Sequence, residues 1–474
     1  MMIIIAIVFA LVFATLTPGT FNNVLFDMSM VVVIFVVVKF LIGSQKGDLK
    51  GFWLKPSYFF VLGFLAVNFQ VLLDYRLGLK SDTSQLVLYP SIFNHCTTLG
   101  VVGLAAFVAG YFSSRSKVRQ TTANAVNDGS LLFLSLAQLV VFAFFIYNID
   151  LVSFLSGMDY GIADSNTTRM YYFENLLYVC NAVIIVTVIK SMNISNLRGY
   201  IHAFPVLPLI IIGLYMIMRL LSGDRGPFIY TALLLMFGYL FATKKKIRFV
   251  KVFLILLAGM LFVSVIGIAR SLDRSDSFSN RFTQGLNAFS ESGRFGSDEK
   301  TVFKLTEEFG VSFIVNQVDV NAVEVEGEKL HYGTYQLITV LNSIPFAPGF
   351  IANVLHIRPE DRGSSGFANY HFFGGYDRNY GIGTTVIGDF YLDLGVIGVL
   401  IGLFLAGMLF RFLDSTICCR QKETIGIYLL LFVLLFSAKS IYVPRSILLI
   451  DLQSFVLGVI LLFVNSLLTG RGRQ

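Results

Sequence analysis

The stretch that decides the fold is residues 385–412, TVIGDFYLDLGVIGVLIGLFLAGMLFRF, in which Asp389 and Asp393 are the only charged residues before Arg411. Its apolar part is long enough to cross a hydrocarbon layer as one helix, which takes about 20 residues. A helix also satisfies the backbone hydrogen bonds within the segment, as the interior of a bilayer requires. The stretch therefore predicts a transmembrane α-helix with two carboxylates near its start.

Similar apolar runs recur along the chain and exclude a single soluble core. Of the 474 residues, 55% are hydrophobic and 14% are charged, and the mean hydropathy is +0.74; a soluble protein carries roughly a quarter charged residues. We predict an all-α polytopic membrane protein with about 12 transmembrane helices. The predicted spans are 2–16, 24–42, 57–75, 91–112, 130–148, 173–192, 203–221, 227–242, 250–269, 385–412, 425–443 and 447–468.

Lys and Arg alternate between frequent and sparse from one loop to the next. The basic loops hold Lys46, Lys50 and Lys55; Arg115, Lys117 and Arg119; Lys190 and Arg198; Lys244, Lys245, Lys246, Arg248 and Lys251; Arg411, Arg420 and Lys422; and Arg471 and Arg473. The positive-inside rule places these loops and both termini in the cytoplasm. The formal net charge of +7 is then a property of cytoplasmic loops, and no nucleic-acid partner is expected.

This topology divides the chain into three parts. Residues 1–269 form a bundle of nine spans, residues 270–384 form one large external loop, and residues 385–474 form the last three spans. A loop of roughly 115 residues is far longer than an ordinary connection and indicates function. Within it we predict an amphipathic helix at 299–316 and interfacial helices at 331–355. We predict a sugar-binding segment at 358–383, with Tyr376, Asp377 and Arg378 among its binding residues.

Arg225 lies in the turn SGDRGP, residues 222–227, between two predicted spans. Pro227 is typical of the first turn of a helix, so Arg225 is expected at a helix N-terminus on the outer side. Helix N-termini attract anions, and Arg225 is predicted to bind an anionic group of a substrate. The alternative is a turn in which Asp224 and Arg225 neutralise each other.

Three further arginines are predicted at the outer face. Arg270 and Arg274 are four residues apart and would share one helix face, where two like charges repel unless an anion such as pyrophosphate lies between them. Arg445 lies in the outer turn before the last span and is assigned to the same binding role. The alternatives are anchoring to lipid headgroups and, for Arg445 or Lys439, an ion pair with Asp451 that joins two helices.

Two kinds of residue are candidates for the base that accepts a proton. Asp389 and Asp393 are four apart on one face, where carboxylates can position an acceptor hydroxyl or take its proton; the alternative is pairing with the arginines. His371 lies among aromatic residues in the large loop, and the alternative is a hydrogen-bonded structural role. We assign catalysis to Asp389 or His371 and sugar binding to Asp393. No spacing indicates a metal or cofactor site.

Three segments carry a resemblance to a known family. Residues 223–227, GDRGP, resemble the G-x-R-x-P/G turn of bacterial oligosaccharide repeat-unit polymerases, the Wzy-type O-antigen polymerases. Residues 332–335, YGTY, followed by Ile344-Pro345, resemble the G-x-x-Y … I-P segment of that family. Residues 383–398, GTTVIGDFYLDLGVIG, are similar to its S-x-x-G-E-x-Y-x-N-x-G-x-x-G entry into a late span, with Asp389 in place of Glu and Asp393 in place of Asn.

The resemblance implies a GT-C-like glycosyltransferase of the bacterial inner membrane with its active site facing the periplasm. Its substrates would be undecaprenyl-pyrophosphate-linked oligosaccharides, which it joins into a surface polysaccharide. Membrane lipid and a chain-length regulator are the expected partners. Three alternatives stay open: an O-antigen ligase that uses the same donor, a flippase or other transporter, and a receptor or structural membrane protein that catalyses no reaction. No internal repeat stands out, which disfavours a transporter built from inverted repeats.

Overall fold

The computed structural model describes residues 22–77, 88–114, 129–151, 165–222, 224–252, 312–344, 363–374, 381–419 and 424–468, with isolated residues between them. Every regular element in these ranges is helical, as predicted. The chain forms two compact units that interleave along the sequence. Unit 1 comprises 1–116, 293–414 and 440–450, and unit 2 comprises 117–292, 415–439 and 451–474.

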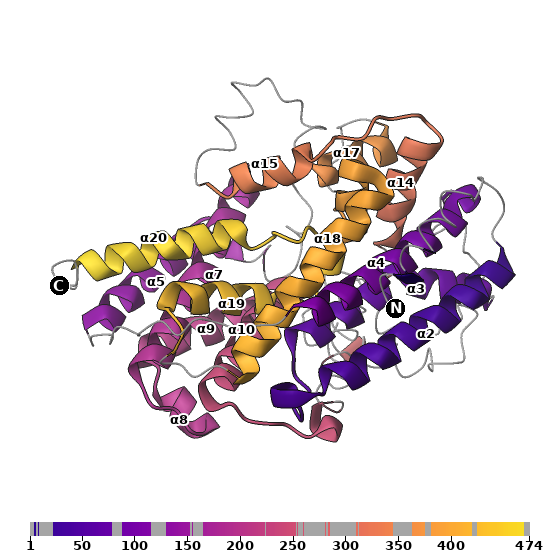
Figure 1. The fold of residues 1–474 in the computed structure, drawn as a ribbon. Coiled ribbons are helices and arrows are strands. Elements are labelled where there is room, and N and C mark those ends of the chain that lie inside the picture. Colours follow the sequence, from indigo (N-terminus) through magenta and orange to yellow (C-terminus); the bar gives the residue numbers. More distant parts are fainter. Residues whose placement is uncertain are drawn as a thin grey trace. The chain divides into compact units, whose positions relative to one another are not determined.

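Unit 1 contains long helices of the early chain and short helices of the predicted large loop (Figure 1). Its α-helices are α2 (Asn23–Ser44), α3 (Pro56–Arg76), α4 (Phe93–Ser113), α14 (Phe313–Glu324), α15 (Thr334–Asn342), α17 (Ser364–Phe373) and most of α18 (Val386–Cys419). Three short 3₁₀ helices complete it: η1 (Gly47–Leu49), η3 (Pro90–Ile92) and η7 (Val443–Arg445).

Helix α4 is buried along its length and forms the centre of unit 1. A side chain at Gly110 would collide with the backbone of Phe404 in α18, and one at Gly407 would collide with the backbone of Phe107 in α4. Such small residues let two membrane helices approach backbone to backbone. The buried Asp414 of α18 accepts hydrogen bonds from the hydroxyls of Ser57, at 2.6 Å, and Tyr111, at 2.7 Å, which fixes α18 to α3 and α4.

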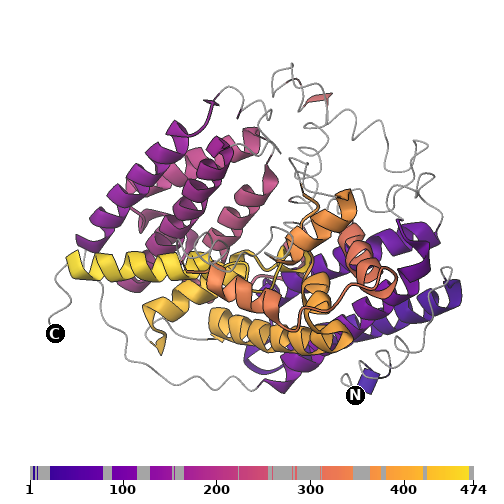
Figure 2. The same ribbon diagram turned by 90° about the horizontal axis from the view of Figure 1, so that it is seen from above.

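Unit 2 is arranged around α7 (Ser165–Ser191), which packs against helices from both ends of the chain. Its other α-helices are α5 (Gly129–Tyr147), α8 (Leu197–His202), α9 (Val206–Leu221), α10 (Arg225–Thr243), α19 (Ile427–Ala438) and α20 (Leu452–Leu468). Figure 2 shows this group from above, with α20 in yellow. Phe145, Leu177 and Tyr215 belong to the apolar core shared by α5, α7 and α9.

Ten of the 12 predicted spans coincide with a described helix, whereas 2–16 and 250–269 fall mainly outside the described residues. Among the described helices, six are long and apolar enough to cross a membrane, and four more are shorter apolar helices. Helix α2 exposes Val24, Met28, Val31 and Ile34, as expected of a surface that faces lipid. The chain is a polytopic helical membrane protein.

Two predicted spans differ from the observed helices in ways that matter for the site. Helix α18 is broken at Leu394 and Gly395, whose φ is 61°, so its first two turns form a separate segment. Helix α19 ends at Ala438, five residues before the end of the predicted span. The predicted amphipathic helix at 299–316 lies mostly outside the described residues, and α14 begins at Phe313.

Candidate functional site

Asp389 lies in the short segment of α18 before the break and is buried. The Ser364 hydroxyl of α17 donates a hydrogen bond of 2.7 Å to one of its carboxylate oxygens. The Gln336 side-chain amide of α15 donates to the other. The carboxylate therefore joins three helices, two of which come from the predicted large loop.

Asp393, one turn later, holds the start of α15. Its carboxylate accepts hydrogen bonds from the backbone N–H groups of Tyr335 and Gln336, both at 3.1 Å. Asp393 therefore caps α15, whose N-cap residue Gly333 has no side chain to do so. The break in α18 frees two carbonyl groups for the same segment: those of Leu392 and Asp393 accept the backbone N–H groups of His331 and Tyr332. The predicted sugar-binding role of Asp393 stays a prediction.

Asp319 of α14 is a third buried carboxylate, and sequence analysis did not single it out. It is 0% exposed, and neither carboxylate oxygen has a hydrogen-bond partner among the described residues. Its side chain lies against Gly388 of α18, where a Cβ atom would collide with it. Burial raises the pKa of Asp319 well above its ordinary value, and the charge of Asp389 raises it further. Burial without a partner thus disfavours the charged form of this carboxyl group.

A polar face on α14 surrounds Asp319. The Asn316 side chain donates a hydrogen bond of 2.8 Å to Asn68 of α3 and accepts one from the Thr385 hydroxyl of α18. The sequence signal for this face is the run NQVDVN, residues 316–321, in which polar residues interrupt an apolar stretch. A helix that turns such residues inward needs polar partners on its neighbours, and α3 and α18 supply them.

His371 of α17 is half-buried and pairs with an acidic residue. Its Nδ1 lies 3.0 Å from a carboxylate oxygen of Glu326, and its ring packs on Phe367 with 4.3 Å between ring centroids. His331 packs on the same Phe367 ring and lies 3.0 Å from the Tyr335 hydroxyl. A histidine whose one nitrogen is held by a carboxylate can present the other to a reacting hydroxyl.

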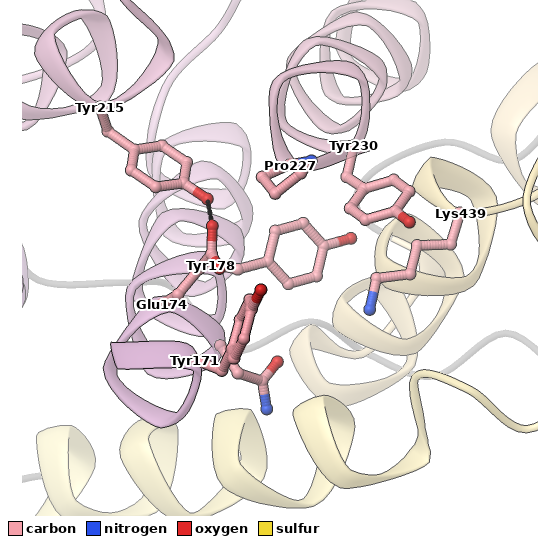
Figure 3. Close-up of a pocket in the computed structure, with 8 residues that line it drawn as sticks. Tyr171, Glu174, Tyr178, Tyr215, Pro227, Tyr230 and Lys439 are labelled. Atoms are coloured by element: carbon pink, nitrogen blue, oxygen red, sulfur yellow. Dashed lines mark hydrogen bonds between the residues drawn. The ribbon is translucent and has the colours of Figure 1, made fainter. Parts of the chain in front are cut away.

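Unit 2 contains a cavity with about 430 Å³ of empty space, counting its open mouth. Figure 3 shows it between α7, α9, α10 and the end of α19. Its charged lining residues are Glu174 and Lys439, and four tyrosines line it as well: Tyr171, Tyr178, Tyr215 and Tyr230. The Tyr215 hydroxyl donates a hydrogen bond of 2.6 Å to Glu174.

The charges beside the cavity are paired. The buried Arg219 of α9 forms ion pairs with Glu174 and with Asp224, the latter at 3.4 Å. Lys439 lies 2.7 Å from Asp451, so for Lys439 the predicted alternative of an ion pair that joins two helices is confirmed. Arg219 was missed in the sequence analysis, although a single Arg in the apolar run VLPLIIIGLYMIMRLL, residues 206–221, is a recognisable signal.

The remaining predicted residues are placed in part. Arg225 is the first residue of α10, as predicted, with Asp224 as its N-cap, and it belongs to unit 2. Arg445 ends η7 in unit 1. The other five predicted site residues lie outside the described residues: Arg270, Arg274, Tyr376, Asp377 and Arg378. The four-arginine anion site therefore stays a prediction.

Comparison with known proteins identifies the family. The apolar helices define a polytopic helical membrane protein. The family described as O-antigen polysaccharide polymerase Wzy matches residues 1–471, so the chain belongs to that family. The match extends over the N-terminal helices as well as the segments that carried the resemblance. Neither the curated proteins nor the solved structures gave a match.

Proposed function

We propose that the protein polymerises undecaprenyl-pyrophosphate-linked oligosaccharide repeat units into an O-antigen-like polysaccharide at the periplasmic face of the inner membrane. A hydroxyl of a new repeat unit attacks the anomeric carbon of the growing chain's reducing-end sugar. The bond between that carbon and the pyrophosphate oxygen breaks, and undecaprenyl pyrophosphate leaves with the electron pair. The hydroxyl proton passes to a base on the protein.

His371 is the base that the geometry favours. The observation that carries the proposed mechanism is the contact between its Nδ1 and the Glu326 carboxylate. Glu326 holds Nδ1, which leaves Nε2 to face a substrate hydroxyl. Asp389 is the less accessible candidate, because both its oxygens already accept hydrogen bonds within a buried junction. We assign Asp389 the role of holding α15 and α17 on α18 and thereby placing His371.

Departure of pyrophosphate develops negative charge, and arginines stabilise such charge. Arg225, Arg270, Arg274 and Arg445 are proposed for that role. Asp393, Tyr376, Asp377 and Arg378 are proposed to bind sugar.

The experiment uses lipopolysaccharide separated by gel electrophoresis from a deletion strain carrying the wild-type gene or a variant. The deletion is expected to remove long chains and to retain a single repeat on the core. Loss of the single repeat as well would instead indicate a ligase or a flippase. His371→Gln is expected to lower the polymerisation rate at least about 100-fold, the usual contribution of a general base, at normal protein level in the membrane.

The matched control is His202→Gln, which changes an exposed histidine of α8 in unit 2 and is expected to leave chain length unchanged. Asp389→Asn separates the two candidate bases. A purified Asp389→Asn variant with wild-type thermal stability and no activity, beside an active His371→Gln variant, would reverse the assignment of the base.

A further inference from the structure

We propose that the tyrosine-lined cavity of unit 2 binds one uncharged sugar ring of the repeat unit. That the sugar belongs to a repeat unit rests on the proposed function. The lining residues of the cavity all belong to unit 2, whereas His371 belongs to unit 1.

The lining has the chemistry of a saccharide site. A pyranose ring has apolar C–H faces and a rim of hydroxyls, and tyrosine is likewise an apolar ring with a polar tip. Four tyrosines line the cavity, and the Asn175 amide lies beside them. An isoprenoid chain would leave the buried Tyr178 hydroxyl without a hydrogen-bond partner, which is costly.

The two cations Lys439 and Arg219 beside the cavity are already paired, which disfavours an anion as their ligand. Lys439 lies 2.7 Å from Asp451, and Arg219 forms ion pairs with Glu174 and Asp224. These two cations therefore face three carboxylates and offer no surplus positive charge to a ligand. The Lys439 ammonium lies 5.0 Å from the Tyr178 ring centroid and 5.3 Å from that of Tyr230, a cation–π arrangement that stabilises it further without a ligand.

One buried hydroxyl points to a missing partner. Tyr178 is 5% exposed, and its hydroxyl has no hydrogen-bond partner among the described residues. Figure 3 shows its ring reaching into the space bordered by Tyr171, Tyr230 and Lys439. Buried tyrosine hydroxyls normally have a hydrogen-bond partner, and a sugar hydroxyl in the cavity would supply one to Tyr178.

The predicted topology brings the cavity to the side where the sugars are. Its lining comes from the start of α7, the end of α9, the start of α10 and the end of α19. The alternation of basic loops assigns each of these four helix ends to the outer face. Tyr171, at the mouth, is 45% exposed and is open to a ligand entering from that side.

The test measures binding of one probe to the purified full-length protein in detergent. The probe is the oligosaccharide repeat unit released from the strain's own surface polysaccharide, and the measurement is isothermal titration calorimetry. Tyr178→Phe removes the unpaired hydroxyl at constant ring volume and is expected to weaken binding about 3- to 10-fold, the value of one hydrogen bond. Tyr171→Ala removes an exposed ring at the mouth and is expected to weaken binding about 10-fold.

Each variant has a matched control. Tyr172→Ala changes the neighbouring exposed tyrosine of α7, which does not line the cavity. Tyr200→Phe changes a buried tyrosine of α8 that donates to the Leu235 carbonyl. Both controls are expected to bind the probe as the wild type does. Wild-type affinity in both Tyr171→Ala and Tyr178→Phe would overturn the proposal, and so would displacement of the probe by undecaprenyl phosphate alone.

His371→Gln separates this proposal from the proposed function. That variant is expected to bind the oligosaccharide with wild-type affinity while failing to polymerise. If His371→Gln polymerises normally and Tyr171→Ala still loses affinity, the assigned base is wrong and the sugar site stands. If His371→Gln is inactive and Tyr171→Ala binds normally, the sugar site is wrong and the assigned base stands.

Discussion

At the scale of single residues, Asp319 is fully buried, and neither of its carboxylate oxygens has a hydrogen-bond partner among the described residues. Its pKa is raised, so over a range of pH the folded protein keeps a proton that the unfolded chain has released. The free energy of unfolding therefore falls as pH rises above the ordinary aspartate value of about 3.9, and it stops falling once the folded-state pKa is passed. Asp319→Asn removes this titration while keeping the shape of the neutral acid.

We therefore expect Asp319→Asn to raise the melting temperature at pH 8 and to flatten its decline between pH 5 and pH 8. Thermal unfolding of the purified protein in detergent at several pH values measures this. The control is Asp48→Asn, at an exposed aspartate in η1, which should follow the wild-type curve. A decline in Asp319→Asn as steep as that of the wild type would contradict the raised pKa of Asp319.

Arg225 and Arg270 give a second prediction at this scale. If they bind the departing pyrophosphate, Arg225→Ala and Arg270→Ala should each lower polymerisation about 100-fold or more, as loss of one preorganised charge-stabilising group does. Gel electrophoresis of lipopolysaccharide, with immunoblots of membrane protein, measures this. Arg248→Ala is the control, because Arg248 is exposed and lies in a basic loop assigned to the cytoplasm. Normal chain length in both arginine variants would refute the pyrophosphate assignment.

At the scale of elements, the break in α18 organises the carboxylate site. Gly395 has a φ of 61° and a ψ of −146°, a conformation that is essentially restricted to glycine. The break ends the first segment of the helix just after Asp393, so that the Leu392 and Asp393 carbonyls can accept backbone N–H groups before α15. Without the break these carbonyls would bond within α18, and α15 would lose its anchor.

Gly395→Ala is therefore expected to cost about 1–3 kcal/mol of unfolding free energy and to lower polymerisation, because α15 and its Gln336 contact to Asp389 shift. Thermal unfolding and the lipopolysaccharide ladder measure the two effects. Gly213→Ala is the control: Gly213 lies inside α9 with no atom within 4 Å of an added Cβ, so alanine there should stabilise slightly. Equal melting temperatures for Gly395→Ala and the wild type would refute the anchoring role of the break.

At the scale of the whole molecule, the sequence predicts helices better than it predicts the partners of buried polar residues. Apolar runs located ten described helices, because a membrane span has a fixed minimum length. Pro227 predicted that a helix begins at this turn, and α10 begins two residues earlier, at Arg225. In contrast, Asp319 and Arg219 each interact with a side chain that lies more than 40 residues away in the sequence, such as Glu174 for Arg219. No local sequence pattern predicts such pairs. The break at Gly395 was missed because one glycine barely changes the hydropathy of a long apolar run.

The orientation of the molecule in the membrane gives the last prediction. The alternation of basic loops assigns the end of α18 to the cytoplasm and the 270–384 segment to the periplasm. Cys419 is exposed at the end of α18, whereas Cys96, Cys180 and Cys418 are buried. Tyr332 is 78% exposed at the start of the α15 region. Cys419 and a cysteine introduced at position 332 therefore report opposite faces of the membrane.

In intact spheroplasts, a membrane-impermeant maleimide is expected to label Tyr332→Cys on a Cys419→Ser background and to spare the native Cys419. After permeabilisation the native Cys419 should be labelled as well, which controls for its reactivity. The buried cysteines should stay unlabelled in both conditions, because the maleimide cannot reach a buried thiol from either side of the membrane. Labelling of Cys419 in intact spheroplasts would invert the topology and, with it, place His371 and the tyrosine-lined cavity on the side of the membrane away from the periplasmic sugars.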